Sequence, residues 1–190
     1  MENNKLIVTA HQPDYFPYPG LFHKLILSDV FVILDNVQFK FDITNRNKII
    51  SKDGKWARIS VPVKKNQTHK KIIDVEINND VEWKNSTIEK IIESYTTSKY
   101  FLDYKEYFVE LYQKKWDMLF ELNYEILKKI IEWLGIKIKI VRESELDIVG
   151  KSTQKLVNIC KALDAETYIS GSGGKNYLNE KLFHDENIKL

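Results

Sequence analysis

The hydrophobic positions near the start of the chain form short continuous runs, and those further on recur at helical spacing. The runs at 5–10 and 30–34 are apolar and rich in β-branched residues, which predicts strands buried on both faces, as in a parallel sheet. Between them, Pro19 suits the first position of a helix with an apolar stripe. A strand, a helix and a strand in this order predict a right-handed parallel βαβ unit.

The middle of the chain begins with alternation and then changes to a helical period. The segments 56–63 and 72–77 alternate as strands do, and we expect the polar segment between them to be an exposed loop. From residue 80 to 134, apolar side chains recur at helical steps, with a capping box at 86–89. We expect a helical excursion over about 80–134, folded as a hairpin that breaks near Asn123.

Strand and helix alternate again towards the end of the chain. We expect strands at 136–141 and 167–170 and a helix at 152–163. The last strand leads into a glycine-rich turn, SGSGG at 170–174. At the carboxyl end of a strand, such a turn can bind an anion or a sugar phosphate through backbone N–H groups. It matches neither the P-loop nor the dinucleotide fingerprint, so an ordinary tight turn is an equally good interpretation.

These elements predict an α/β fold with a mostly parallel sheet, flanking helices and the helical excursion in the middle. A length of 190 residues favours one domain over 1–190. The chain is 43% hydrophobic and 29% charged, which is typical of a globular protein and not of a disordered one.

Charge and cysteine content narrow the partners and the compartment. The 29 Lys and Arg residues are interspersed with 27 Asp and Glu residues, and the net charge of +2 argues against a nucleic-acid partner. Cys160, the one cysteine, falls on the apolar side of an expected helix, which favours a buried thiol and a reducing compartment. We find no apolar run of the ~18 residues that span a membrane and no signal-peptide pattern, so we expect a cytoplasmic protein.

Candidate catalytic residues follow the first two expected strands. His11 comes directly after 5–10 and Asp35 directly after 30–34, and ligands of parallel sheets bind at the carboxyl ends of strands. His11 suits a general acid or base near neutral pH, and Asp35 suits a group that orients it or a substrate amine. The competing interpretations are a buried histidine bonded to the backbone and an aspartate that only ends a strand.

Candidate binding residues lie mainly in the proline-stiffened turn 12–19, the polar loop 38–48 and the glycine-rich turn. Amides suit sugar hydroxyls, cations suit phosphate or carboxylate, and aromatic rings suit stacking on a sugar or base. A solvated loop is the competing interpretation for 38–48. The residues expected to contact a substrate are Gln12, Tyr15, Tyr18, Lys24, Gln38, Asn45, Arg46, Asn47, Lys48, Trp56, Ser170, Gly171, Gly173, Gly174 and Tyr177.

Metal and nucleophilic chemistry find little support in the sequence. The histidines at 11, 23, 69 and 184 show no ligand spacing, and Cys160 has no partner, so we expect neither a metal site nor a cofactor. The sequence contains no serine elbow and no readable Cys–His pairing, which argues against a covalent mechanism.

Taken together, these segments resemble the WbqC-like protein family. The resemblance rests on AHQPDYFPYPGLFHKL at 10–25, DVFVILDNVQF at 29–39, NRNKI at 45–49, WARISVPV at 56–63 and the tyrosine- and glycine-containing segment 168–178, and it extends over nearly the whole chain. The chain departs from the family pattern at Asn85, where a histidine is usual, and it ends at Leu190, before a C-terminal segment into which such proteins commonly continue.

The resemblance implies a role in bacterial surface-polysaccharide, or O-antigen, biosynthesis. It implies a lipopolysaccharide-related transferase that acts on an amino-sugar or a sugar nucleotide, with aminoacyl or acyl transfer among the reactions. The order of strand, His11, helix and strand also resembles pantoate–β-alanine ligases, which implies a nucleotidylyltransferase-like opening of the fold.

Three functions stay open at this point. The leading hypothesis is the transferase, with small-molecule substrates, His11 as acid or base and Arg46 binding an anion. The second is a non-catalytic sugar- or nucleotide-binding module that assists a partner enzyme. The third is a nucleic-acid module, which needs a basic patch on one face that the interspersed charges do not supply. The sequence leaves the oligomeric state open.

Overall fold

The computed structural model describes residues 6–190, and the chain folds into two compact units. Of the described residues, the first unit contains 6–13, 17–37 and 127–190, and the second contains 14–16 and 38–126. A single domain over the whole chain stays a prediction. We describe each unit by itself.

The first unit is built on a four-stranded sheet in which all the neighbouring strands are parallel. In sheet order, the strands are β5 (Lys139–Arg142), β2 (Val30–Ile33), β1 (Ile7–His11) and β6 (Thr167–Tyr168). All four residues of β2 are buried, as the continuous apolar run predicted. The sheet therefore confirms the predicted α/β class, although a nucleotidylyltransferase-like opening is not confirmed.

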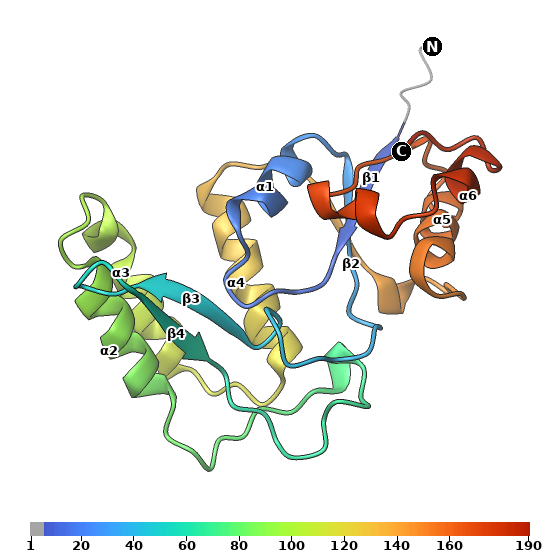
Figure 1. Cartoon of the computed structure of the whole chain (residues 1–190). Helices are drawn as coiled ribbons and strands as arrows, with labels where there is room; N and C mark the ends of the chain where they lie inside the picture. Colours follow the sequence, from blue (N-terminus) through green and yellow to red (C-terminus); the bar gives the residue numbers. More distant parts are fainter. Residues whose placement is uncertain (1–5) are drawn as a thin grey trace. The chain divides into compact units, whose positions relative to one another are not determined.

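Helices cover the two faces of this sheet. Figure 1 shows α5 (Ser152–Ala162) and α6 (Glu180–His184) on one side of β1 and β2, and α1 (Pro19–Ile26) on the other. The buried side chains between the sheet and helices α5 and α6 include Val8, Ala10, Val30, Val32, Leu156, Val157, Ile159, Cys160 and Phe183. Because side chains alternate along a strand, His11 leaves β1 on the face opposite to Ala10.

The second unit contains an antiparallel hairpin and two helices. In the hairpin, β3 (Arg46–Ile50) pairs with β4 (Trp56–Ser60) in the register Arg46 to Ser60 and Ile50 to Trp56. Helices α2 (Lys84–Tyr95) and α3 (Phe101–Gln113) follow, and α4 (Leu119–Trp133) runs from this unit into the first. Ile49 and Ile59 are buried on the inner face of the hairpin, whereas Ile50 is exposed.

The expected strand at 72–77 is wrong. The chain forms a 3₁₀ turn, η1 (Ile72–Asp74), and only isolated bridges join Ile77 to Val63 and Glu76 to Met118. Ile72 and Val75 are both fully buried, and their three-residue spacing suits a 3₁₀ turn better than a pleated strand. The alternation of apolar residues in this segment therefore did not indicate a strand.

Other boundaries also moved. The helical hairpin breaks between Gln113 and Leu119, earlier than expected, and Asn123 is a buried residue of α4. Helix α2 starts before the expected capping box, because the Glu82 carboxylate accepts hydrogen bonds from the backbone N–H groups of Asn85 and Ser86. A carboxylate at this end of a helix satisfies free N–H groups and favours the helix dipole.

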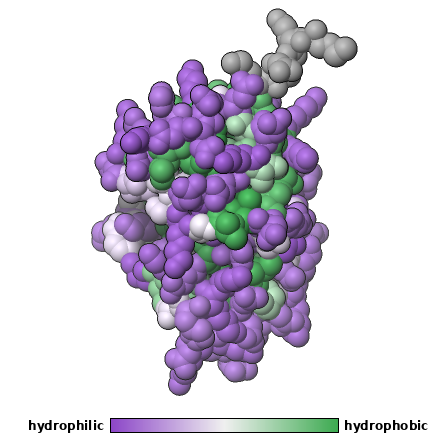
Figure 2. Space-filling view, turned by 90° about the vertical axis from the view of Figure 1, so that its right-hand side faces the viewer, coloured by the Kyte–Doolittle hydropathy of each residue, from purple (hydrophilic) through white to green (hydrophobic). Residues whose placement is uncertain are grey.

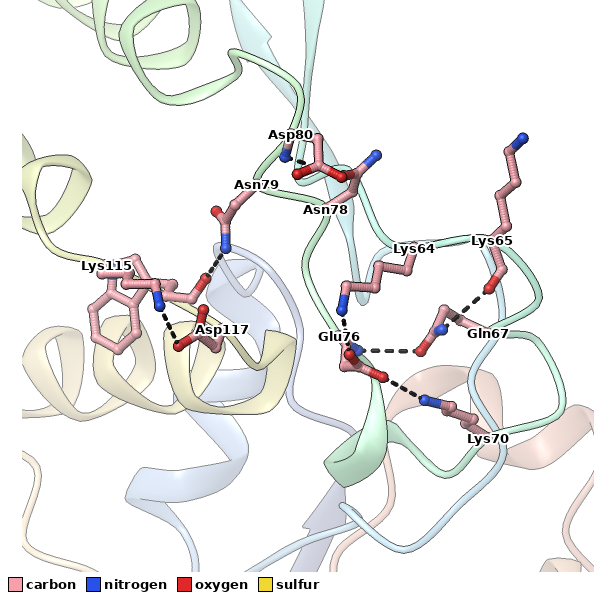
Figure 3. A network of polar contacts seen from close by, with 11 residues as sticks. Lys64, Lys65, Gln67, Lys70, Glu76, Asn78, Asn79, Asp80, Lys115 and Asp117 are labelled. Carbon is pink, nitrogen blue, oxygen red and sulfur yellow. Dashed lines mark hydrogen bonds and ion pairs between the residues drawn. The ribbon is translucent and has the colours of Figure 1, made fainter.

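A polar network closes the loop 64–71 in the second unit. Figure 3 shows Glu76 between Lys64 and Lys70, with the Gln67 side chain accepting a hydrogen bond from the Glu76 backbone N–H. The hydrogen bonds from Lys64 and then Lys70 lower the pKa of Glu76 to about 2. The expected exposed loop is therefore tied to the segment after η1 by a carboxylate that stays charged over the ordinary pH range.

The surface is polar over most of the face shown in Figure 2, with apolar side chains gathered between the polar ones. Among the helices of residues 6–190, none combines the length and the apolar character that crossing a membrane requires.

Candidate functional site

The side chain of His11 lies at the carboxyl end of β1. The backbone there is fixed, because the Leu34 N–H donates to the His11 carbonyl at 2.8 Å. The His11 Nδ1 atom lies 3.1 Å from the Gln12 carbonyl oxygen. A carbonyl oxygen can only accept, so Nδ1 carries the proton of the neutral ring and Nε2 carries the lone pair.

Burial and a neighbouring cation keep His11 neutral. Burial lowers the pKa of His11 to about 4, the charge of Lys24 adds to this shift, and the bond with Gln12 opposes it. Lys24 comes from α1, is 6% exposed and donates to the Ala10 carbonyl at 3.3 Å. At neutral pH the pair therefore presents a neutral imidazole beside a buried ammonium group.

Tyr18 and Gly171 complete this group. The rings of His11 and Tyr18 have centroids 6.2 Å apart. A Cβ atom built on Gly171 would lie 3.7 Å from the Tyr18 hydroxyl and 4.0 Å from Lys24 Cδ, so the glycine faces both side chains. We call His11, Tyr18, Lys24 and Gly171 the β1 edge cluster. Four of the residues expected at the site thus gather at the carboxyl ends of β1 and β6, which are neighbours in the sheet.

The glycine-rich turn continues into a 3₁₀ helix, η3 (Ser172–Asn176). Its two central glycines have different surroundings: a Cβ on Gly173 would meet nothing within 4 Å, whereas one on Gly174 would lie 1.8 Å from Ser170 Oγ. Gly174 is buried. Tyr177 is 68% exposed at the end of η3. Gly174 therefore shapes the turn, whereas Gly173 and Tyr177 are exposed to solvent.

We expect Gly174→Ala to lower the free energy of unfolding by about 2 kcal/mol, because the added methyl group forces Ser170 and Leu178 to move. Gly173→Ala is the matched control and should change it by less than about 0.5 kcal/mol. Urea denaturation followed by circular dichroism measures both variants. Equal stability of the two would contradict the close packing around Gly174.

Asp35 is fully buried and has definite partners. Its carboxylate accepts from Arg142 Nε at 3.2 Å, from the Ser144 backbone N–H at 2.9 Å and from Ser144 Oγ at 2.6 Å. These bonds join the end of β2 to the last residue of β5 and to the segment that follows it. They give Asp35 a structural role, and an orienting role towards His11 stays a prediction.

Most of the amides expected to bind a sugar hold backbone instead. Asn45 is buried and donates to the Val61 carbonyl, and Gln38 donates to the Thr68 carbonyl. Asn47 donates to the carbonyls of Tyr15 and Phe16. These bonds explain why the loop 38–48 is rich in amides without requiring a ligand.

The structure does not place Tyr15 where it could stack on a substrate, as the sequence led us to expect. Its side chain is fully buried, and its hydroxyl pairs with the hydroxyl of Tyr112, so the ring belongs to the core of the second unit and is not exposed for stacking on a substrate. Burial is the main reason that its pKa lies far above the ordinary value for tyrosine.

Arg46, Lys48 and Trp56 lie on the outer face of the hairpin. Strand alternation places Arg46 and Lys48 on one face of β3, and the Lys48 Nζ atom lies 4.6 Å from the centre of the Trp56 ring. Lys48 is paired directly across the hairpin with Arg58, a residue that the sequence did not single out. This face combines cations with an exposed indole, and its substrate contacts stay a prediction.

The described residues give no support for metal binding or for thiol chemistry. Within residues 6–190, no three His, Cys, Asp or Glu side chains are placed to hold a metal ion together. Cys160 is buried, and burial raises its pKa to about 12, which keeps the thiol protonated and unreactive.

Comparison with known proteins gives a family and one distant relative. The model of the WbqC-like protein family matches residues 12–190. The uncharacterized protein Rv1507c of Mycobacterium tuberculosis is 28% identical over 186 residues, which cover 96% of this chain and 80% of that protein. No solved structure matches the chain significantly.

Proposed function

Because the chain belongs to the WbqC-like protein family, we propose that it is a transferase of bacterial surface-polysaccharide biosynthesis that acts on an amino-sugar or a sugar nucleotide. The observation that carries this proposal is the β1 edge cluster, in which neutral His11 lies beside the Lys24 cation and the Gly171 backbone. The carboxyl ends of adjacent parallel strands are where α/β proteins bind such ligands.

The cluster suits transfer of an acyl or aminoacyl group to an amine. Lys24 would bind the anionic part of the substrate, and Gly171 would let the substrate approach the backbone closely. The amine would attack the acyl carbon while His11 Nε2 accepts its proton. The new C–N bond then forms and the bond from the acyl carbon to the donor breaks. The proton passes from His11 to the leaving group of the donor. A bound anion would offset the charge of Lys24, which would raise the pKa of His11 towards its ordinary value and strengthen it as a base.

The test is product formation from a panel of sugar nucleotides and acyl donors, measured by mass spectrometry. We expect His11→Ala to lower the rate by about 100-fold or more, which is the ordinary contribution of a general base, and to leave the melting temperature within a few degrees of wild type. A variant that keeps its rate would show that His11 has no role as acid or base.

Gly171 offers a second test that does not need turnover. In Gly171→Ala the methyl group would make ordinary contacts with Tyr18 and Lys24, so the fold should persist while the space next to them becomes smaller. We expect the ligand-induced thermal shift to decrease in this variant and to persist in Gly173→Ala, whose methyl group meets nothing. The same shift in both variants would place the ligand elsewhere.

A non-catalytic sugar- or nucleotide-binding module is the second candidate function. The observation that favours it is the low pKa of His11, about 4, which makes the imidazole a weak base and suits a hydrogen-bonding group. Ligand-induced thermal shifts without turnover over the whole panel would support this alternative.

A further inference from the structure

We propose that the second unit contains a binding site for an aromatic ring system, separate from the β1 edge cluster and independent of the function proposed there. The site is a pocket of about 300 Å³ lined by residues of the hairpin, of helices α2 and α3, and of the turn that contains Phe16. Its lining consists of Phe16, Asn47, Lys48, Ile49, Ile59, Ile91, Tyr95, Phe101 and Phe108.

The pocket has a buried floor and partly exposed aromatic walls. Ile49, Ile59, Ile91 and Phe101 are each less than a tenth exposed. Phe16, Tyr95 and Phe108 are half-buried, so their rings are accessible to a ligand. Apolar pockets of this size with a few polar groups are typical of small-molecule sites.

The aromatic walls form a continuous series of ring contacts. Phe16 lies 6.0 Å from Phe108 between ring centroids, Phe108 lies 6.3 Å from Phe101 at an interplanar angle of 16°, and Phe101 lies 6.2 Å from Tyr95. Aromatic pairs gain energy beyond the area that they bury, so such walls favour a ring over an aliphatic group of equal size.

The size of the pocket limits the ligand. An apolar cavity of about 150 Å³ holds one benzene molecule, so this pocket holds roughly two fused rings. Tyr95 supplies a polar contact: its hydroxyl oxygen accepts from the Ile50 N–H at 3.2 Å, and its own proton can be donated to a ligand. The second lone pair of the hydroxyl oxygen can also accept, so the class that fits is an indole- or naphthalene-sized group with one polar atom that donates or accepts a hydrogen bond.

The backbone conformation of Phe16 is separate evidence that this wall of the pocket contacts a ligand. Its φ angle is 54°, in the left-handed region that bulky residues rarely adopt. Asn47 holds this conformation by donating to the Tyr15 and Phe16 carbonyls at 3.0 and 2.7 Å. Strained backbone that the surrounding structure holds in place is concentrated at ligand sites.

The test uses indole and 2-naphthol as probes on the whole protein with ¹³C-labelled isoleucine methyl groups. We expect saturable ring-current shifts of the Ile49, Ile59 and Ile91 methyl groups and none at Ile159 and Ile188, which belong to the core of the first unit. Hexanol is the aliphatic control. It causes no ring-current shift, so its affinity is measured by displacement of indole, and it should bind about twofold to tenfold more weakly than indole.

Two substitutions on neighbouring positions of β3 make a matched pair. Ile49→Phe places a ring inside the pocket and should weaken indole binding by about tenfold, whereas Ile50→Phe, at a position that is 61% exposed, should leave it unchanged. If Ile49→Phe does not fold, the wild-type shifts and the hexanol comparison still decide the question. Equal shifts in both units, unchanged binding by folded Ile49→Phe, or tighter binding of hexanol would overturn the proposal.

Discussion

Replacing Asp35 with alanine is expected to lower the free energy of unfolding by about 3 kcal/mol. The carboxylate is fully buried and accepts three hydrogen bonds, one from the Arg142 guanidinium and two from Ser144. Its removal would leave the Ser144 N–H without its acceptor and would remove the shorter of the two ion pairs that Arg142 Nε makes with Asp35 and Glu145. The cost lies at the lower end of the range for broken buried pairs, because the Arg142 side chain is 34% exposed and can reach water.

Glu145 is the matched control for this substitution. It also pairs with Arg142 Nε, at 3.9 Å, but its side chain is 60% exposed. An exposed pair contributes little, so Glu145→Ala should cost less than about 1 kcal/mol. Urea denaturation followed by tryptophan fluorescence measures both free energies. A loss below about 1 kcal/mol in Asp35→Ala would show that the carboxylate is not the link between β2 and the segment after β5.

The same experiment separates the two roles considered for Asp35. Asp35→Asn keeps the volume and one acceptor oxygen for the Ser144 N–H, but it turns an amide donor towards Arg142. If the role is structural, stability should fall together with ligand-induced thermal shifts. A variant of nearly normal stability that has lost those shifts would instead favour a role in orienting His11 or a substrate.

The elements of the first unit could be predicted because their signals are local. The apolar run of β2, the proline at the start of α1 and the apolar spacing of α5 each lie within a few residues, and the structure has these elements within one or two residues of the expected bounds. The position of His11 and of the glycine-rich turn at the sheet edge could be predicted in the same way, since each follows a strand and the carboxyl ends of neighbouring parallel strands lie at one edge; their role in a site stays a prediction.

The partners of these residues could not be predicted in this way. Arg142 and Ser144 lie 107 and 109 residues from Asp35 in sequence, and nothing in their local pattern indicates the contact. The amides of 38–48 show a different limit of sequence reasoning. Their composition suggested sugar binding, but the same composition also suits hydrogen bonds to backbone carbonyls, which is what the structure contains. Only the fold reveals that Asn47 lies next to Tyr15, which is 32 positions earlier.

Asn47→Ala is expected to cost about 2–3 kcal/mol of unfolding free energy, which is a large effect for one half-buried amide. Its side chain donates to the Tyr15 and Phe16 carbonyls and accepts from the Lys48 N–H at 2.7 Å, and each bond contributes about 1 kcal/mol. Without the two donors, Phe16 should leave its left-handed conformation, and the pocket should lose one aromatic wall. We therefore expect urea denaturation to show the loss of stability and indole binding to weaken by about tenfold.

Asn47→Asp distinguishes loss of the donors from loss of the side chain. The aspartate keeps the acceptor for the Lys48 N–H but cannot donate, and it places a carboxylate against two carbonyl oxygens, so it should be at least as destabilising as alanine. Asn79→Ala is the control: its exposed amide makes one bond, to the Trp116 carbonyl, and should cost about 1 kcal/mol or less. If Asn47→Asp is as stable as wild type, the two donated bonds do not hold the Phe16 turn, and the strain at Phe16 has another origin.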